Sequence, residues 1–368
     1  MLKRKYILPL LLIVQIILLK ILALFPEFIE QYYSNGFYAK LSYFERTAFG
    51  WIPFSFGDVL YFIVIFLVLR WFWKKRKTLR SEWKDNILKV LSFMSVFYFL
   101  FNFLWGINYH RVKLSEKMHI GKDYSETQLL LFTSRLIAKT NQIHWQITKN
   151  DSAKVVFPYS QQQVFEKNLE GYQNLATVYP DFKYEKASVK KSIISLPLTY
   201  MGFGGYLNPF TNEAQVNDKL PMYGFPMTAT HEMAHQIGYA SESEANFIGY
   251  LASVKNDDLY FQYAGYTTAL KYCLGNWDSR PNAEQDEAKR NKIRHEKILK
   301  ELLKTIHPGI LKNFDESSDF WDSYETFIET GFKIFYDRFL KLNQQDEGLD
   351  SYNRFVDLLV NYYKNEQL

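Results

Sequence analysis

The chain has 368 residues, of which 48% are hydrophobic and 23% are charged, and its formal net charge is +5. This length accommodates a membrane region together with one sizeable globular domain. Residues 1–110 carry 14 basic and 6 acidic side chains, so the rest of the chain, with 30 basic and 33 acidic side chains, is slightly acidic. A slightly acidic globular part without a basic patch argues against nucleic acid as a partner.

Three long apolar segments lie in the first third of the chain, at about residues 6–25, 54–73 and 87–107. Each is near the ~20 residues that a helix needs to cross a bilayer, so we predict three transmembrane helices with the lipid bilayer as a partner. A cleaved signal peptide is the alternative for the first segment, but no small-residue cleavage site follows it and Pro26 comes directly after. We therefore assign residues 1–108 to a membrane anchor and residues 109–368 to a globular domain.

Basic residues predict the side of the membrane on which each connection lies. They cluster at residues 3–5 and 74–77, whereas the connection 26–53 has few. By the positive-inside rule, the N-terminus and the second connection lie in the cytoplasm, and the third helix leads residues 109–368 out of the cell. The one cysteine, Cys273, has no partner for a disulfide within the chain, and we expect it to be a small buried residue.

The globular part begins with helical patterns and continues with β-prone segments. Helical periodicity predicts helices at about residues 125–141 and 159–175. Residues 188–196 have the composition of a strand that Pro197 ends. The segment 202–217 has two β-prone stretches around an Asn-Pro-Phe-Thr-Asn turn. This segment predicts either an ordinary β-hairpin or a strand edge on which an extended peptide pairs. The domain as a whole is predicted to be α+β.

The most specific motif is His231-Glu232-Met233-Ala234-His235. On a helix, residues four apart share one face, so both imidazoles reach a single ion. Glu232 lies one step around the helix, where its carboxylate is placed to deprotonate the water in an open coordination position. The motif therefore predicts one Zn²⁺ per chain, with His231 and His235 as ligands and Glu232 as the general base. A helix with two exposed histidines is the alternative without function.

A second helix after the motif supplies a third ligand. Gly238 is a natural end for the first helix, and residues 242–252 predict the next one. On that helix Glu242, Asn246 and Gly249 fall on one stripe. We expect Glu242 to complete a His2Glu site, Asn246 to orient a ligand histidine, and Gly249 to let the two helices approach closely.

Glu244 is the alternative metal ligand. It also completes the pattern Ser241-x-x-Glu244, which is a capping box for the N-terminus of the second helix. Because Glu242 shares its face with Asn246 and Glu244 does not, we favour Glu242 as the ligand and expect Glu244 to cap the helix.

Beyond residue 252 the chain is predicted to be mostly helical. Residues 282–305 form a charged helix that Pro308 ends, and residues 320–365 are helical with a break at Gly348. Zinc peptidases also need a donor that stabilises the oxyanion, and the downstream candidates are Tyr336, Arg338 and Tyr352. The remaining histidines have no partner at metal-ligand spacing: His110, His119, His144, His295 and His307.

The motif His231-Glu232-x-x-His235 followed by Glu242-x-x-Ala245-Asn246 resembles the gluzincin metallopeptidases, where a helix carrying E-x-x-A/S-D supplies the third ligand. The segment 202–217 and the three apolar spans are similar to a family of uncharacterised, membrane-anchored bacterial proteins placed beside those peptidases. The resemblance implies a zincin-like domain at the bacterial inner membrane, facing the periplasm or exterior. Two departures are Asn246 in place of Asp and a short gap from His235 to Glu242. A metzincin would need a third histidine at position 241, where serine stands.

The sequence thus predicts a zinc metallopeptidase on a three-helix membrane anchor, acting on peptide or protein substrates of the cell envelope. The alternative is a membrane-anchored binding or sensory protein that keeps a zincin fold without turnover. The intact Glu232 argues against that alternative, since a site that only binds metal needs no base. An intramembrane protease is the weakest alternative, because no apolar run of about 20 residues surrounds the motif.

Overall fold

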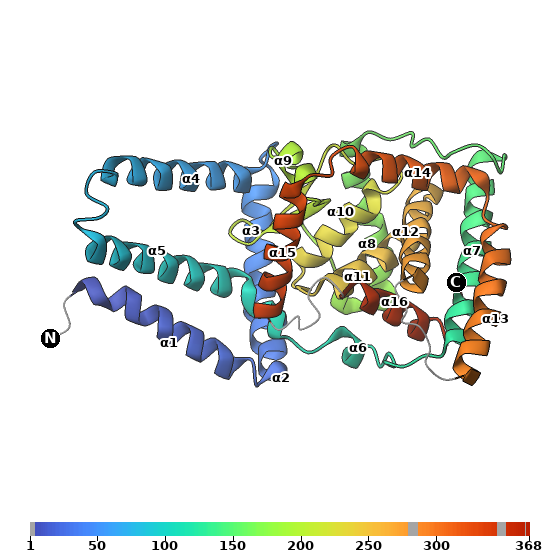
Figure 1. Ribbon diagram of the computed structural model, residues 1–368, viewed down its shortest axis with the longest axis horizontal. Coiled ribbons are helices and arrows are strands. Elements are labelled where there is room, and N and C mark those ends of the chain that lie inside the picture. The colour runs from blue at the N-terminus through green and yellow to red at the C-terminus, as the bar shows by residue number, and fades with distance from the viewer. Residues whose placement is uncertain (1–3, 279–285, 344–350, 365) are drawn as a thin grey trace.

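The computed structural model describes residues 4–278, 286–343, 351–364 and 366–368. It is mostly helical, with one small three-stranded sheet and three long apolar helices near the N-terminus. In Figure 1 the apolar helices extend from one end of a globular part that contains the sheet and the remaining helices. The prediction of a mainly helical chain with three apolar helices is confirmed.

The three apolar helices are α1 (Ile7–Leu22), α4 (Phe56–Lys75) and α5 (Trp83–Leu104). Each is long and apolar enough to cross a membrane, and at least half of its residues are exposed. Ser55 begins α4 by accepting a hydrogen bond from the Asp58 backbone N–H. Figure 1 shows the start of α1 and the connection between α4 and α5 together at the end away from the globular part.

The connection between the first two apolar helices packs onto the globular part. It forms α2 (Pro26–Phe28), the π-helix η2 (Ile29–Tyr38) and α3 (Ala39–Gly50). The Tyr38 and Ser42 hydroxyls donate to the Gln236 carbonyl at 3.0 and 2.7 Å. Residues that we placed with the anchor therefore support the end of the helix that carries the metal motif.

A buried ion cluster fastens this connection to the chain that leaves α5, through η3 (Gly106–His110) and α6 (Leu114–Lys117). The Arg111 guanidinium donates to the Glu30 carboxylate from Nε at 2.8 Å and from Nη2 at 2.7 Å. Lys117 Nζ lies 2.7 Å from the same carboxylate. Burial acts to raise the pKa of Glu30, but the hydrogen bonds and charges of Arg111 and Lys117 outweigh it and lower this pKa to about 2.

The globular part opens with two long helices. These are α7 (Glu126–Thr148) and α8 (Gln161–Val178), and they begin with capping boxes at Ser125 and Ser160. Both predicted helices are present, and each continues beyond its predicted end. The short η4 (Pro180–Phe182) leads from α8 towards the sheet.

The sheet has the order β1-β3-β2, with β1 (Val189–Lys191) parallel to β3 (Glu213–Val216) and β2 (Gly205–Asn208) antiparallel to it. The predicted hairpin in 202–217 is confirmed, and β2 is an edge strand among the described residues. The predicted strand 188–196 is wrong in length. It ends at Lys191 because the Ile193 N–H turns to the Asp58 carboxylate at 2.7 Å. Pro197 lies in the first turn of α9 (Ser195–Tyr200), where its missing N–H costs no helical bond.

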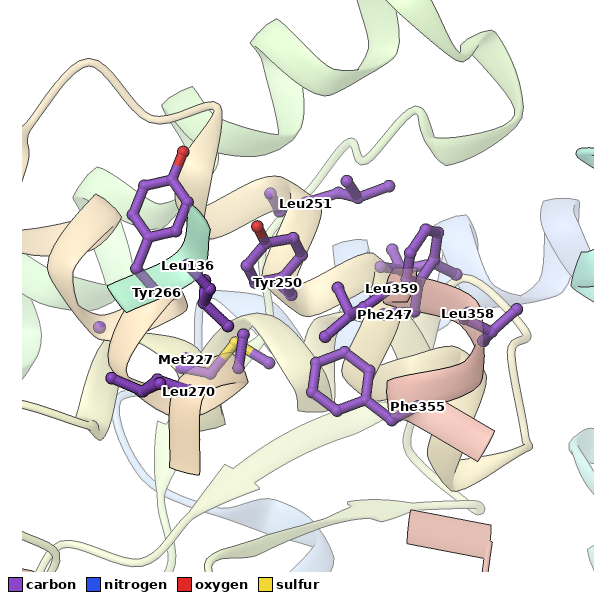
Figure 2. Close-up of a cluster of buried hydrophobic side chains, with 14 of the residues drawn as sticks. Leu136, Met227, Phe247, Tyr250, Leu251, Tyr266, Leu270, Phe355, Leu358 and Leu359 are labelled. Carbon is purple, nitrogen blue, oxygen red and sulfur yellow. The ribbon is translucent and has the colours of Figure 1, made fainter. Parts of the chain in front are cut away.

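The core is built around α10 (Phe225–Gln236) and α11 (Glu242–Val254), with α12 (Leu259–Asp278) and α16 (Ser351–Tyr362) packed on them. Figure 2 shows the side chains that fill this core, and Cys273 is buried, as predicted. The labelled members of the cluster are Leu136, Met227, Phe247, Tyr250, Leu251, Tyr266, Leu270, Phe355, Leu358 and Leu359.

The remaining helices are α13 (Asp286–Leu303), α14 (Pro308–Asp322) and α15 (Phe327–Leu342). Pro308 begins α14, because the first turn of a helix tolerates proline, rather than only ending the helix before it. The predicted helical stretch 320–365 is divided after Asp322, and the break predicted at Gly348 lies outside the described residues. Figure 1 shows α15 running across the globular-side ends of the apolar helices rather than along them.

Candidate metal centre

The motif residues lie on α10, and the helix brings both imidazoles together. His231 Nε2 and His235 Nε2 are 3.1 Å apart, as the spacing of four residues predicts. The helix ends directly after the motif, where Gly238 adopts a φ of +91° and its N–H donates to the His235 carbonyl at 3.0 Å. The chain therefore turns sharply and returns along the metal motif as α11.

Close packing of α11 on α10 places a third donor beside the two imidazoles. A Cβ on Gly249 would lie 2.8 Å from the His231 backbone nitrogen, so only glycine allows this approach. At the N-terminus of α11, Glu242 Oε2 lies 3.3 Å from His231 Nε2 and Glu242 Oε1 lies 3.7 Å from His235 Nε2. The structure thus brings His231, His235 and Glu242 together.

The second nitrogen of each imidazole faces an acceptor. His231 Nδ1 lies 2.9 Å from Asn246 Oδ1, and His235 Nδ1 lies 2.6 Å from the Tyr239 carbonyl oxygen. With the proton on Nδ1, each ring turns the lone pair of Nε2 towards Glu242 and towards the other ring. Two lone pairs and a carboxylate in this proximity repel one another unless a proton or a metal ion lies between them.

The donor separations fit a tetrahedral metal site. Ligand bonds of about 2.0–2.2 Å to zinc place neighbouring donor atoms about 3.3 Å apart. The observed separations of 3.1, 3.3 and 3.7 Å lie around this value. Ligand atoms of His231, Glu232 and His235 also lie within 4.8 Å of one another. These residues are therefore a possible metal-binding group.

Glu232 has an unpaired carboxylate oxygen inside the protein. Its Oε2 is buried and makes no hydrogen bond with the described residues. The carboxylate lies over β2, where a Cβ on Gly205 would come within 2.7 Å of Glu232 Oε1. A buried carboxylate oxygen without a hydrogen bond destabilises the fold. Its presence here therefore indicates a functional role in which Glu232 Oε2 binds something other than the protein. Burial, only partly offset by the charge of His231, raises the pKa of Glu232 to about 8.

The electrostatics of the three donors indicate a site made for positive charge. Burial acts to raise the pKa of Glu242, but the His231 hydrogen bond and the two imidazoles outweigh it and lower this pKa to about 2. Burial acts to lower the pKa of His231, yet the hydrogen bond with Glu242 and nearby carboxylate charge raise it. Burial dominates at His235 and lowers its pKa to about 4. Glu242 is therefore held as an anion by the imidazoles and the hydrogen bonds around it.

Of the three candidate oxyanion donors, one lies at the site. The Tyr336 hydroxyl, on α15, donates to Glu242 Oε1 at 2.5 Å. Arg338 is exposed and does not line the cavity beside the site. The side chain of Tyr352 lies outside the described residues.

Sequence reasoning missed two aromatic residues that lie beside the motif. Trp105 donates from its indole nitrogen to the His235 carbonyl at 3.3 Å, and its ring meets the His235 ring edge-on at 6.0 Å. Burial, with a contribution from the charge of Glu242, raises the pKa of Tyr109. Both follow the third apolar helix directly, and no local motif distinguishes them from the other aromatic residues there.

Glu244 is not placed with the metal donors. The Glu244 Oε1 accepts a hydrogen bond from the Leu114 N–H at 2.7 Å, so it caps α6. The predicted capping box with Ser241 is wrong, since the Ser241 side chain makes no cap hydrogen bond and instead lies 3.1 Å from the Ser243 hydroxyl. Glu244 accepts from the distant Leu114 N–H rather than from the start of its own helix. The Leu114 N–H lies at the start of α6, where it would otherwise be an unpaired donor.

The site opens into a cavity of about 1140 Å³. Its lining includes Glu232, the metal donors, Tyr336 and three residues of β2, together with residues of the apolar helices. His110, which had no predicted role, also lines it. A cavity of this size holds more than a small metabolite.

Comparison with known proteins identifies a family whose function is unknown. Residues 33–360 match the model of a family described as "Protein of unknown function (DUF3810)". No curated protein and no solved structure matches the chain. The resemblance to gluzincins therefore rests on the residues of the site itself.

Proposed function

We propose that this chain, which belongs to the DUF3810 family, is a zinc-dependent peptidase anchored by its three apolar helices. The observation that supports the proposal is that three metal donors lie beside an unpaired buried carboxylate. Two imidazoles and the Glu242 carboxylate converge to within 3.7 Å, and beside them the unpaired Glu232 carboxylate lies on an edge strand. Metal donors alone would suit a structural site, but a free buried carboxylate next to them suits catalysis.

In this proposal His231, His235 and Glu242 hold one zinc ion per chain. Bound there, zinc would supply a Lewis acid that polarises the scissile carbonyl and lowers the pKa of the attacking water. Asn246 and the Tyr239 carbonyl keep both imidazoles in the tautomer that offers Nε2. The donor set leaves room for water, as three protein ligands do in catalytic zinc sites.

Glu232 moves the proton. Its carboxylate accepts a proton as the water oxygen forms its bond to the carbonyl carbon. It returns that proton to the amine nitrogen as the carbon–nitrogen bond breaks, so the carboxylate is regenerated. Tyr336 is the donor that we assign to the developing oxyanion, because its hydroxyl is at the site and Arg338 is not.

The edge strand supports a peptide as substrate. On one side β2 pairs with β3, and among the described residues it has no strand on its other side. Gly205, Tyr206 and Leu207 of β2 line the cavity, and Gly205 lies beside Glu232. An extended peptide that adds to this edge would lie alongside the Glu232 carboxylate and gain main-chain hydrogen bonds.

We place the active site outside the cytoplasm of a bacterial cell. The basic residues Arg4 and Lys5 and the cluster at 74–77 belong to the end of the apolar helices away from the globular part. The positive-inside rule assigns that end to the cytoplasm, which leaves the globular part in the periplasm or at the cell exterior. Its substrates would then be proteins or peptides of the envelope.

The test compares the wild-type full-length protein with Glu232→Gln in detergent, using a proteome-derived peptide pool and elemental analysis of bound metal. We expect Glu232→Gln to keep its metal and to lose about 10²–10⁴-fold in cleavage rate. The matched control is Glu244→Gln, which alters a carboxylate of the next helix outside the donor set and should retain cleavage. Undiminished cleavage by Glu232→Gln would contradict the mechanism, and loss of metal together with activity would indicate a structural role for Glu232.

A further inference from the structure

The cavity beside the metal donors extends onto the apolar helices. Its lining includes Ile16 and Leu19 of α1, Tyr61 of α4, and Phe97 and Phe101 of α5. A site for soluble peptides has no need of walls made by membrane-spanning helices. The cavity therefore joins the chemical groups to the region that the bilayer occupies.

The cavity extends part of the way along the apolar helices from the globular part. Ile16 lies six residues before the end of α1 at Leu22, and Phe97 lies seven residues before the end of α5 at Leu104. With a rise of 1.5 Å per residue, these positions lie about 9–10.5 Å from the globular-side ends of the helices. The hydrocarbon core of a bilayer is about 30 Å thick, so the cavity reaches into the leaflet next to the globular part.

Helix α15 covers the cavity at the level of the membrane surface. Phe332, Phe335 and Phe339 line the cavity from α15. Phe327 and Leu342 at its two ends are 86% and 84% exposed, which is unusual for large apolar side chains in water. An amphipathic helix that lies across the ends of membrane-spanning helices is typical of one embedded in the interface (Figure 1).

Of the three apolar helices, α1 and α5 pack against each other and α4 stands apart from them. Helix α1 packs along α5, with Gln15 Nε2 of α1 3.4 Å from Ser95 Oγ of α5. Within the described spans, no side-chain hydrogen bond or aromatic pair joins α4 to either helix. Phe210 of the hairpin turn bridges them at the globular end, at 6.2 Å from the Tyr61 ring and 5.3 Å from the Phe97 ring.

We propose that the substrate is a polypeptide held in the bilayer by an apolar segment, and that this segment occupies the cavity between α4 and the α1–α5 pair. The proposal rests on the peptidase function above and specifies its substrate class. A chain that leaves the cavity towards the globular part meets the β2 edge and then Glu232, so the cleaved bond lies just beyond the apolar segment. A lipid would fill the apolar walls, but it has no backbone to pair with β2.

Crosslinking in lipid nanodiscs tests the occupant without requiring turnover. A photoreactive amino acid replaces Leu19, which lines the cavity, or Leu18, its neighbour on α1, which is 58% exposed and outside the lining. Both variants carry Glu232→Gln. The probe is a peptide library with one 20-residue apolar span followed by a mixed polar segment, in phosphatidylcholine and phosphatidylglycerol.

We expect the Leu19 position to crosslink the anchored peptides at least tenfold more than the Leu18 position. Equal crosslinking from both positions, or crosslinks from Leu19 to lipid alone, would overturn the proposal. A second measurement uses the active protein with Leu19→Trp or Leu18→Trp. Leu19→Trp narrows the cavity, so it should lower kcat/KM for the anchored peptide at least tenfold more than it lowers kcat/KM for the same peptide without its apolar span. Equal losses for both peptides would contradict this account.

The two proposals fail in different ways. If no peptide is cleaved by any variant while Leu19 still crosslinks the anchored peptides, the peptidase function is wrong and the membrane-side binding site stands. If soluble peptides are cleaved and Leu19 yields no peptide crosslinks, the peptidase function stands and the anchored substrate class is wrong.

Discussion

Gly249→Ala should separate the two helices that form the metal site. The new Cβ would lie 2.8 Å from the His231 nitrogen, 3.0 Å from His231 Cα and 3.1 Å from the Thr230 carbonyl carbon. All three are backbone atoms of α10, so no side-chain rotation relieves the overlap. Ordinary contact begins near 3.4 Å, so α11 must move away by about 0.6 Å. Overpacking of this kind costs about 1–3 kcal/mol of stability.

The same movement acts on the metal donors. The 3.3 Å separation of His231 Nε2 from Glu242 Oε2 spans the two helices, so it should lengthen as they separate. We expect zinc affinity to fall about 10–100-fold, as it does when supporting contacts of a metal site are lost. Zinc titration against a competing chelator measures the affinity, and thermal unfolding of the full-length protein measures the stability.

Gly275→Ala is the matched control for this substitution. Gly275 lies within α12, and among the described residues no atom beyond its chain neighbours and the surrounding helix backbone lies within 4 Å of the position its Cβ would take. Alanine should there be neutral or stabilise the helix by up to about 1 kcal/mol, with zinc affinity unchanged. If Gly249→Ala kept both the zinc affinity and the unfolding midpoint of the wild type, the close approach of α10 and α11 would not support the site.

Three further outcomes are expected. Glu242→Ala should abolish tight zinc binding, whereas Glu244→Ala should keep the metal. Glu244→Ala should lower the free energy of unfolding by about 1–3 kcal/mol, because it leaves the Leu114 N–H unpaired. Zinc titration and thermal unfolding of both variants test these expectations. Glu30→Gln should destabilise the protein by about 3 kcal/mol at pH 7. Because the folded pKa of Glu30 is lowered to about 2, this difference is complete above about pH 4.5 and is lost as the pH falls towards 2, so melting curves of wild type and variant should converge on acidification. Protease added to intact spheroplasts should digest the globular part, and full protection until lysis would reverse the proposed orientation.

Local periodicity was sufficient to predict which residues meet at the candidate site. His231 and His235 share a helical face, and the stripe of Glu242, Asn246 and Gly249 lies against it. Each of these relations depends on two helices joined by a short turn. The three apolar helices were predictable for a similar reason, because their length and composition are properties of a continuous segment.

Contacts between distant parts of the chain were not predictable in the same way. Tyr336 reaches Glu242 across 94 positions, and nothing local distinguished it from Arg338 or Tyr352. Glu244 had a local cap available at its own helix, yet it accepts from Leu114, 130 positions away. Such pairings are decided by how the helices pack, which depends on side chains throughout the core.

Local sequence patterns also did not predict that residues 26–50 pack against the helix that carries the metal motif. Residues 26–50 read as a connection between two spans, and the structure folds them beneath the end of α10. Tyr38 is fully buried there, with its hydroxyl on the Gln236 carbonyl. The cavity that joins Glu232 to Leu19 depends on this arrangement, because it sets where the apolar helices meet the globular part.

The metal content of the purified full-length protein tests the central claim most directly. After reconstitution with zinc and removal of excess metal, elemental analysis should find one zinc per wild-type chain. His231→Ala should hold none, while His295→Ala, which alters a histidine paired with Glu126 away from the site, should hold one. Equal zinc content in wild type and His231→Ala would contradict the assignment of His231, His235 and Glu242 as the metal site.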